Sequence, residues 1–164
     1  MSQEREGELK EAQNKALELC ARAEQYSQGL KTKLRARGFD TGVIGEAIEV
    51  LAQKGIVDDL RYATIWARAR AQRKGEGPAV IAAGLRAKGL DTKIVKEALA
   101  DIDFGAIIPL AIEKEVRRLS KLLASSKLKG GEEFRDELYR SLKAQGFDAF
   151  QLKDALESYW ENDK

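Results

Sequence analysis

A fifteen-residue pattern that occurs three times limits most strongly what this chain of 164 residues can fold into. The copies are LRARGFDTGVIGEAI at 34–48, LRAKGLDTKIVKEAL at 85–99 and LKAQGFDAFQLKDAL at 142–156. Five positions are identical in all three copies and hold Leu, Ala, Gly, Asp and Ala, in that order. A pattern that returns after 51 and then 57 residues predicts tandem structural repeats.

Each copy predicts two helices joined by a tight turn. Apolar residues before the glycine, such as Leu30 and Leu34, recur at helical spacing. We expect Gly38, Gly89 and Gly146 to have positive φ and to end the first helix, because glycine adopts this backbone state at little cost. The Asp two residues later is placed to cap the next helix.

The length of each repeat leaves room for a third helix, and the sequence predicts one at 8–25, 59–74 and 104–126. The core-facing stripes predicted for them are Leu9, Ala12, Ala16, Leu19 and Ala23; Tyr62, Ile65, Trp66 and Ala69; and Ile108, Ala111, Ile112, Glu115 and Leu119. The predicted fold is therefore all-α, with three tandem three-helix repeats forming an elongated, curved array. A single nine-helix globule is the alternative.

The repeat boundaries follow from the same pattern. Repeat 1 covers 1–55 and has a frayed N-terminus at residues 1–7. Repeat 2 covers 56–101, and repeat 3 covers 102–164 with a longer first helix and an acidic end. The segment 125–133 is rich in Ser, Lys and Gly, which predicts a mobile connection inside repeat 3.

Composition argues against most classes of enzyme. Histidine is absent, which removes the commonest general base and metal ligand, and we expect no catalytic residue, no metal and no cofactor. The one cysteine, Cys20, shares a predicted helical face with Ala16 and Leu17 and is interpreted as a small core residue. The charged N-terminal stretch has no apolar signal region, and no apolar run approaches membrane-spanning length. We expect a cytoplasmic monomer.

Two local features resemble functional sites but have simpler structural explanations. Asp58 and Asp59 stand at a predicted helix start, where an N-cap and a first-turn acid are far commoner than a metal site. The segment KGEGPAVI resembles a phosphate loop but lacks the required spacing. Its Gly77 and Pro78 instead predict a turn followed by the first residue of a helix.

Charge is small overall, at +2, but unevenly distributed. Residues 61–96 hold nine Lys and Arg against two Asp and Glu, whereas residues 130–164 hold five against nine. This excess predicts a contact with a polyanion or an acidic protein groove, although a solvated helix face is the simpler interpretation. The candidate partner-binding residues are Arg61, Arg68, Arg70, Arg73, Lys74, Arg86 and Lys88.

The segment IVDDLRYATIWARARAQRKGEGPAVIAAGLRAKGLDTKIVKEAL at 56–99 resembles the RecX family of recombinase regulators. The resemblance rests on a motif like that of the family: a D-D-x-R-Y-A segment, an Arg some residues later, a G-x-G-P turn and the sequence L-x-x-K-G. The matching residues are Asp58, Asp59, Arg61, Tyr62, Ala63, Arg68 or Arg70, Gly75, Gly77, Pro78, Leu85, Lys88 and Gly89. With the weaker matches in the other repeats, the resemblance covers nearly the whole chain.

The resemblance implies a regulator of recombination, DNA repair and the SOS response that binds the RecA protein and its filament on DNA. Such a regulator inhibits the recombinase, ATPase and co-protease activities by occupying the filament groove and blocking growth or promoting disassembly. The alternative is a direct DNA-binding protein, without sequence specificity, built from tandem helix-turn-helix-like units. The predicted helix starts of this chain, such as Thr41-Gly42-Val43, lack the Arg, Asn or Gln side chains that usually contact base edges.

The elongated array predicts a radius of gyration well above the roughly 15 Å expected for a compact domain of this length. Small-angle X-ray scattering of the protein in dilute solution measures this quantity directly. A radius near the compact value would favour the single nine-helix globule instead.

Overall fold

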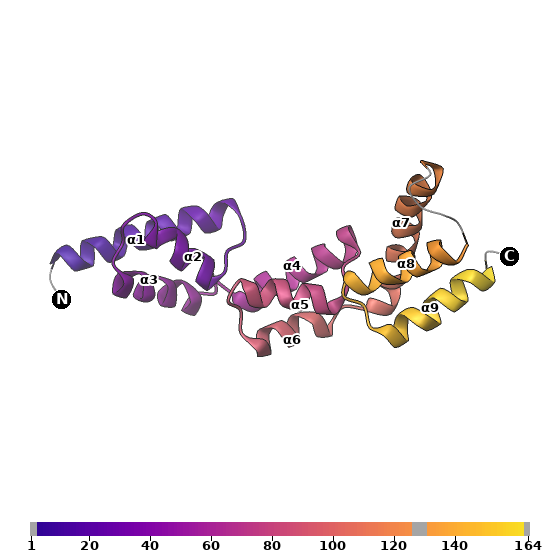
Figure 1. Cartoon of the computed structure of the whole chain (residues 1–164). Coiled ribbons are helices and arrows are strands. Elements are labelled where there is room, and N and C mark those ends of the chain that lie inside the picture. Colours follow the sequence, from indigo (N-terminus) through magenta and orange to yellow (C-terminus); the bar gives the residue numbers. More distant parts are fainter. Residues whose placement is uncertain (1–2, 126–130, 163–164) are drawn as a thin grey trace. The chain divides into compact units, whose positions relative to one another are not determined.

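The computed structural model describes residues 3–125 and 131–162, and within them all regular secondary structure is α-helix (Figure 1). The predicted all-α class and the order of three helices per repeat are confirmed. The helices are α1 (Gln3–Arg22), α2 (Ser27–Arg35), α3 (Thr41–Gln53), α4 (Asp59–Lys74), α5 (Pro78–Ala87), α6 (Thr92–Ala100), α7 (Phe104–Ala124), α8 (Glu132–Ala144) and α9 (Ala149–Asn162).

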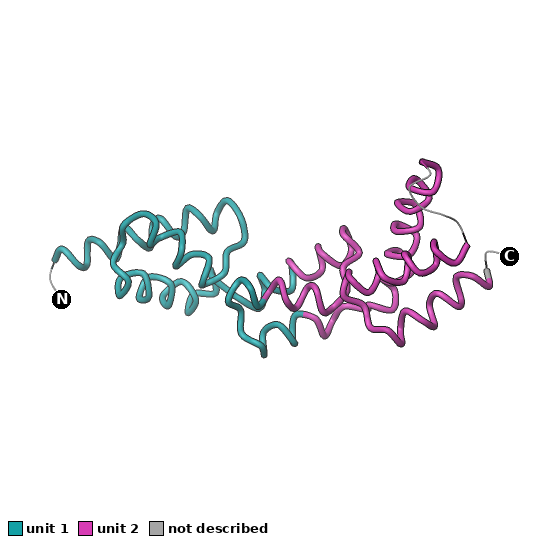
Figure 2. The backbone as a smooth tube through the Cα atoms, viewed as in Figure 1, with its two compact units in different colours: residues 1–65, 86–98 teal, residues 66–85, 99–164 magenta. Residues whose placement is uncertain are grey.

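The contacts divide the chain into two compact units (Figure 2). Unit 1 contains residues 1–65 and 86–98, and unit 2 contains residues 66–85 and 99–164. The division falls inside α4, so the central three helices contribute to both units. The repeat boundaries predicted at 55/56 and 101/102 both fall in connections between helices.

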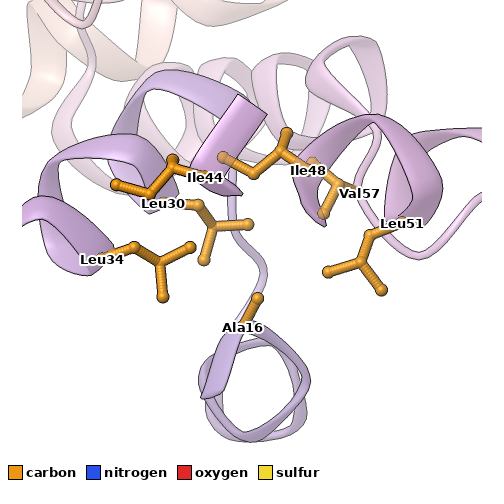
Figure 3. Close-up of a cluster of buried hydrophobic side chains, with 7 residues drawn as sticks. All are labelled: Ala16, Leu30, Leu34, Ile44, Ile48, Leu51 and Val57. Carbon is orange, nitrogen blue, oxygen red and sulfur yellow. The ribbon is translucent and has the colours of Figure 1, made fainter. Parts of the chain in front are cut away.

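The core of unit 1 lies among α1, α2 and α3. Its larger cluster of buried side chains, drawn in Figure 3, consists of Ala16, Leu30, Leu34, Ile44, Ile48, Leu51 and Val57. Cys20 packs against this cluster, and burial, followed by the nearby Glu24 carboxylate, raises the pKa of its thiol. Phe39, which follows the turn glycine, packs against this cluster and a second buried group. The interpretation of Cys20 as a small core residue agrees with these contacts.

The three turn glycines have the predicted backbone state. The φ angles are +88° at Gly38, +81° at Gly89 and +93° at Gly146. The three Asp caps are also confirmed. Each Asp carboxylate accepts a hydrogen bond from a backbone N–H two residues later: Asp40 from Gly42 (2.8 Å), Asp91 from Lys93 (2.7 Å) and Asp148 from Phe150 (2.8 Å). Each turn therefore ends one helix and starts the next with local interactions.

Some predicted helix ends and faces are wrong. Helix α1 begins at Gln3, so residues 3–7 are helical rather than frayed, and it ends at Arg22, which leaves Ala23 exposed outside the helix. Leu17 does not share the buried face of Ala16, because it is 39% exposed. Of the predicted mobile connection at 125–133, residues 126–130 lie outside the described residues.

The predicted core stripe of α4 is also wrong. The residues buried along this helix are Ala63, Ala67 and Ala71, while Ile65 is 52% exposed and Tyr62 and Trp66 are only half-buried. Alanines four residues apart lie on the same face of a helix and let neighbouring backbones approach closely. The aromatic side chains lie beside this stripe instead of forming it.

The core of unit 2 includes a charged group, Glu115. The predicted stripe of α7 is buried, and Glu115 within it is only 5% exposed. Its carboxylate accepts hydrogen bonds from Arg118 (Nε, 2.7 Å), the Ser141 hydroxyl and the Gln145 amide. Burial by itself would raise the pKa of Glu115, but the hydrogen bonds from Arg118 and Ser141 hold it below its ordinary value.

A second feature of unit 2 is the contact between the turn before α5 and the turn after α8. The Gly77 N–H donates to the Gln145 carbonyl (2.7 Å), and the Ala79 N–H donates to the Gly146 carbonyl (3.2 Å). A Cβ atom at Gly77 would lie 2.5 Å from the Gly146 carbonyl carbon, and one at Gly146 would lie 2.5 Å from the Val80 nitrogen. Only glycine fits at both positions.

Replacing a turn glycine can lower stability in two ways: by strain at positive φ and by a clash of the added Cβ atom with a neighbouring helix. Gly38→Ala should lower the free energy of unfolding by about 1–2 kcal/mol, because a Cβ disfavours positive φ while the space around it is open. Gly146→Ala should cost about 1–3 kcal/mol more, because its Cβ also meets the backbone of α5. Urea denaturation of the two variants makes the comparison, and equal losses would refute the close approach.

The buried carboxylate predicts an acid-sensitive contribution to stability. Because its pKa is lowered in the folded state, Glu115 stabilises the protein fully above its unfolded pKa of about 4.3 and loses this contribution as pH falls through the folded pKa. Urea denaturation of Glu115→Gln should show a smaller loss of stability between about pH 5 and pH 3 than the wild type. Glu157→Gln, at an exposed site, is the control and should follow the wild type.

Candidate functional site

The seven cations predicted to bind a partner are divided between the two units. Arg61, Arg86 and Lys88 belong to unit 1, and the others, Arg68, Arg70, Arg73 and Lys74, belong to unit 2. Their surroundings show which positive charges the fold itself uses. A side chain that forms several internal bonds has fewer donors left for a partner.

Arg61 is used by the fold of unit 1. Its Nε donates to the carboxylate of Glu24 (2.8 Å), which stands in the connection between α1 and α2. Its two terminal nitrogens donate to the carbonyls of Gly55 and Ile56 at 3.0 Å each. All three guanidinium nitrogens are thereby engaged, and Arg61 ties two loops to the start of α4.

The neighbouring acids have structural roles as well. The Asp58 carboxylate accepts a hydrogen bond from the backbone N–H of Arg61 (2.9 Å), so the predicted N-cap is confirmed. The Asp59 carboxylate accepts the Ser27 N–H (2.7 Å) at the start of α2, where Tyr26 at the N-cap position offers no side-chain bond. Sequence reasoning missed this second cap, because its donor lies 32 residues away.

Lys88 lies over a pair of tyrosines in unit 1. The rings of Tyr26 and Tyr62 have centroids 4.5 Å apart, and the Lys88 ammonium lies 5.4 Å from the first and 5.9 Å from the second. This geometry suits a cation–π interaction. Arg86, on the last turn of α5, is exposed and pairs with no described acid.

Arg70 is used by the fold of unit 2. Its guanidinium carbon lies 5.0 Å from the Trp66 ring, and its Nε donates to the carboxylate of Glu76. The edge of Trp66 in turn covers Gly84, where a Cβ atom would lie 2.5 Å from the indole. Arg70 therefore links α4 to the turn before α5, which begins, as predicted, at Pro78.

Three cations of α4 remain on the surface of unit 2. Arg68 is 52% exposed, and its guanidinium lies 3.9 Å from the carboxylate of the exposed Asp101. Arg73 and Lys74 are exposed on the last turn and form no ion pair with a described residue. Lys114, from α7, donates to the backbone carbonyls of Arg73 (3.3 Å) and Lys74 (3.0 Å), which adds a further positive charge at the end of this helix.

Sequence reasoning missed the cations of α7. Lys114, Arg117 and Lys121 occur at the spacing i, i+3, i+7, which places them on one face of the helix. They lie beyond the basic stretch at 61–96, and counting charges over long segments concealed them. The signal that could have revealed them is the spacing of Lys and Arg residues on one face of the helix predicted at 104–126.

The described residues show neither a metal site nor a membrane-spanning helix. There, no group of three or more His, Cys, Asp or Glu side chains is placed to hold a metal ion. In the same part of the chain, no helix combines the length and the apolar character needed to cross a bilayer.

Solved structures support the fold. A crystal structure of RecX from Lactobacillus salivarius aligns with a TM-score of 0.76 at 23% identity, covering 93% of this chain and 96% of that one. A second crystal structure, of a regulatory protein RecX, aligns with a TM-score of 0.78 at 17% identity. The alignment covers 92% of this chain and 73% of that one.

Sequence comparisons agree with the structural ones. The profile described as "RecX, second three-helix domain" matches residues 58–99. A "Regulatory protein RecX" of Mycobacterium sp. (strain JLS) is 41% identical over 88 residues, so the chain matches only 48% of that relative's length. The protein of the same name from Halorhodospira halophila is 32% identical over 149 residues, 91% of this chain and 88% of its own length. This chain therefore belongs to the RecX family of regulatory proteins.

Proposed function

We propose that this protein binds the filament that RecA forms on DNA and inhibits its recombinase, ATPase and co-protease activities. The observation that carries the proposal is membership of the RecX family, with 32% identity over 91% of the chain to a protein named as a regulator. Nothing in the proposal requires catalysis by this chain. It acts as a cytoplasmic monomer, through binding alone.

The proposed contacts are the exposed cations that the fold does not use. Arg61 and Arg70 are occupied by internal partners, so their side chains contribute to the interface mainly by shaping the surface. Arg68, Arg73 and Lys74 in unit 2 and Arg86 in unit 1 remain exposed. Exposed positive charges attract an acidic partner and increase the rate of association, and of these four only Arg68 has a described acid nearby, Asp101 at 3.9 Å.

The repeated helices suit a filament as a partner. In the proposed complex the three repeats occupy the filament groove and contact successive RecA protomers. Several weak contacts on one chain raise the overall affinity without any single strong contact. Occupancy of the groove then blocks growth or promotes disassembly.

The test is neutralisation of the exposed cations of α4. The triple variant Arg68→Gln, Arg73→Gln, Lys74→Gln should inhibit the RecA ATPase on single-stranded DNA only at a several-fold higher concentration than the wild type. Its melting temperature should change little, because exposed ion pairs contribute about 0–1 kcal/mol to folding.

The matched control removes three exposed cations from α8 and α9 of the same unit: Arg140→Gln, Lys143→Gln, Lys153→Gln. It changes net charge equally and should inhibit nearly as well as the wild type. Equal loss from both triple variants would show that inhibition depends on total charge and not on α4.

A further inference from the structure

Three hollows follow one another along helix α7, and all three lie within unit 2. Their volumes are about 320, 360 and 370 Å³, in the order from the start of α7 to its end. The residues of α7 that line them include, in the same order, Gly105, Ile108, Pro109, Ile112, Val116 and Ser120. These residues recur every three or four positions and therefore form a single face of the helix.

Helix α9 joins the hollows to one another. Ala155 and Ser158 line both the first and the second hollow, and Tyr159 lines both the second and the third. The hollows therefore adjoin and form one groove, which we name the α7–α9 groove after the two helices that run along it. Between Gly105 in the first hollow and Leu123 in the third, α7 rises by about 27 Å.

The α7–α9 groove is mostly apolar, and large apolar side chains are exposed at both of its ends. Phe150 in the first hollow is 73% exposed, and Leu123 in the third is 41% exposed. Exposed apolar side chains beside a groove mark a surface that is stabilised when a partner covers it. Each hollow is at the small end of the range of ligand sites, about 300–1,000 Å³. A row of small hollows suits a row of side chains better than one small molecule.

The first two hollows carry negative charge. Asp154 lines the first and Glu113 lines the second, and no Lys or Arg among the described residues lines either. The cations nearest to these acids in sequence do not neutralise them. Lys153 approaches Glu157 (4.0 Å), and Arg117, one turn after Glu113, forms no ion pair with a described residue. The charge of these two hollows is therefore complementary to a cationic partner.

The third hollow has the opposite charge. Arg135 of α8 lines it, and its guanidinium carbon lies 4.8 Å from the centre of the Trp160 ring, which lines the same hollow. The groove is therefore negative near the start of α7 and positive near its end. A partner whose Lys and Arg residues stand beside the first two hollows matches this distribution.

We propose that the α7–α9 groove binds an amphipathic helix of a partner protein. Helices that bind in grooves place apolar side chains at i, i+3 or i+4 and i+7, about one per turn, which matches a row of adjoining hollows. Lys or Arg beside these apolar side chains would pair with Asp154 and Glu113. This interaction goes beyond the proposed function, because it needs neither the RecA filament nor the cations of α4.

The test is fluorescence anisotropy of labelled synthetic peptides of about 18 residues, the length that spans the groove as a helix. The first peptide has Leu at i, i+4, i+7 and i+11 and Lys at the flanking positions. The second has Glu in place of Lys, and the third has the residues of the first in an order without an apolar face. The full chain should bind the first peptide roughly tenfold more tightly than either of the others.

Two variants place the binding in the groove. Glu113→Lys, Asp154→Lys should reverse the preference between the Lys and Glu peptides, because it reverses the charge of the first two hollows. Ala155→Phe should weaken binding of the Lys peptide, because a larger side chain would fill the space that these two hollows share. Thermal melting followed by circular dichroism shows that each variant is folded.

The control is Glu132→Lys, Asp136→Lys, which changes net charge equally. These acids lie on the side of α8 about opposite Phe134, which lines the third hollow, so this variant should bind the Lys peptide like the wild type. Equal loss in the control would overturn the proposal, since net charge alone would then explain the binding. Equal binding of the first and third peptides, or of none, would also overturn it.

A second copy of the chain is the competing occupant of the groove. Analytical ultracentrifugation should show no self-association that Ala155→Phe abolishes, and such self-association would overturn the proposal. A chain that inhibits the RecA ATPase but binds none of the peptides would refute the helix-binding groove and leave the proposed function standing.

Discussion

The close approach of the Gly146 turn to the start of α5 is the contact on which the order of unit 2 depends. The backbone of Gly146 has positive φ, its carbonyl accepts the Ala79 N–H, and its α-carbon leaves no room for a side chain. The same turn ends α8 and, through Asp148, begins α9. One glycine therefore determines two helix ends and the position of a third helix. The repetition of this turn at Gly38 and Gly89 gives the chain its three-helix periodicity.

The residues that carry the strongest family resemblance serve mainly this architecture. Asp58 and Asp59 cap two different helices, Arg61 ties two loops together, and Gly77 allows the close contact with Gly146. Their internal hydrogen bonds leave little for a partner. The proposed binding surface consists instead of less distinctive residues, such as Arg73 and Lys74, which are exposed and form no ion pair with a described residue.

Sequence reasoning predicted the features that depend on local interactions. The turn glycines, the Asp caps and the buried stripe of α7 all follow from spacings of a few residues. The face of α4 could not be predicted in this way, because the buried residues Ala63, Ala67 and Ala71 are small, while the larger apolar side chain of Ile65 is exposed. The role of Arg61 depends on Glu24, which is 37 residues away, and no local pattern contains that information.

The most direct test measures how the wild-type protein binds two targets at the same salt concentration. One is the RecA filament assembled on single-stranded DNA, and the other is the same DNA without RecA. The proposed function predicts that the protein sediments with the filaments at concentrations at which bare single-stranded DNA retains little of it. Equal retention on the two would contradict the account, because DNA alone would then explain the binding and the filament would not be the partner.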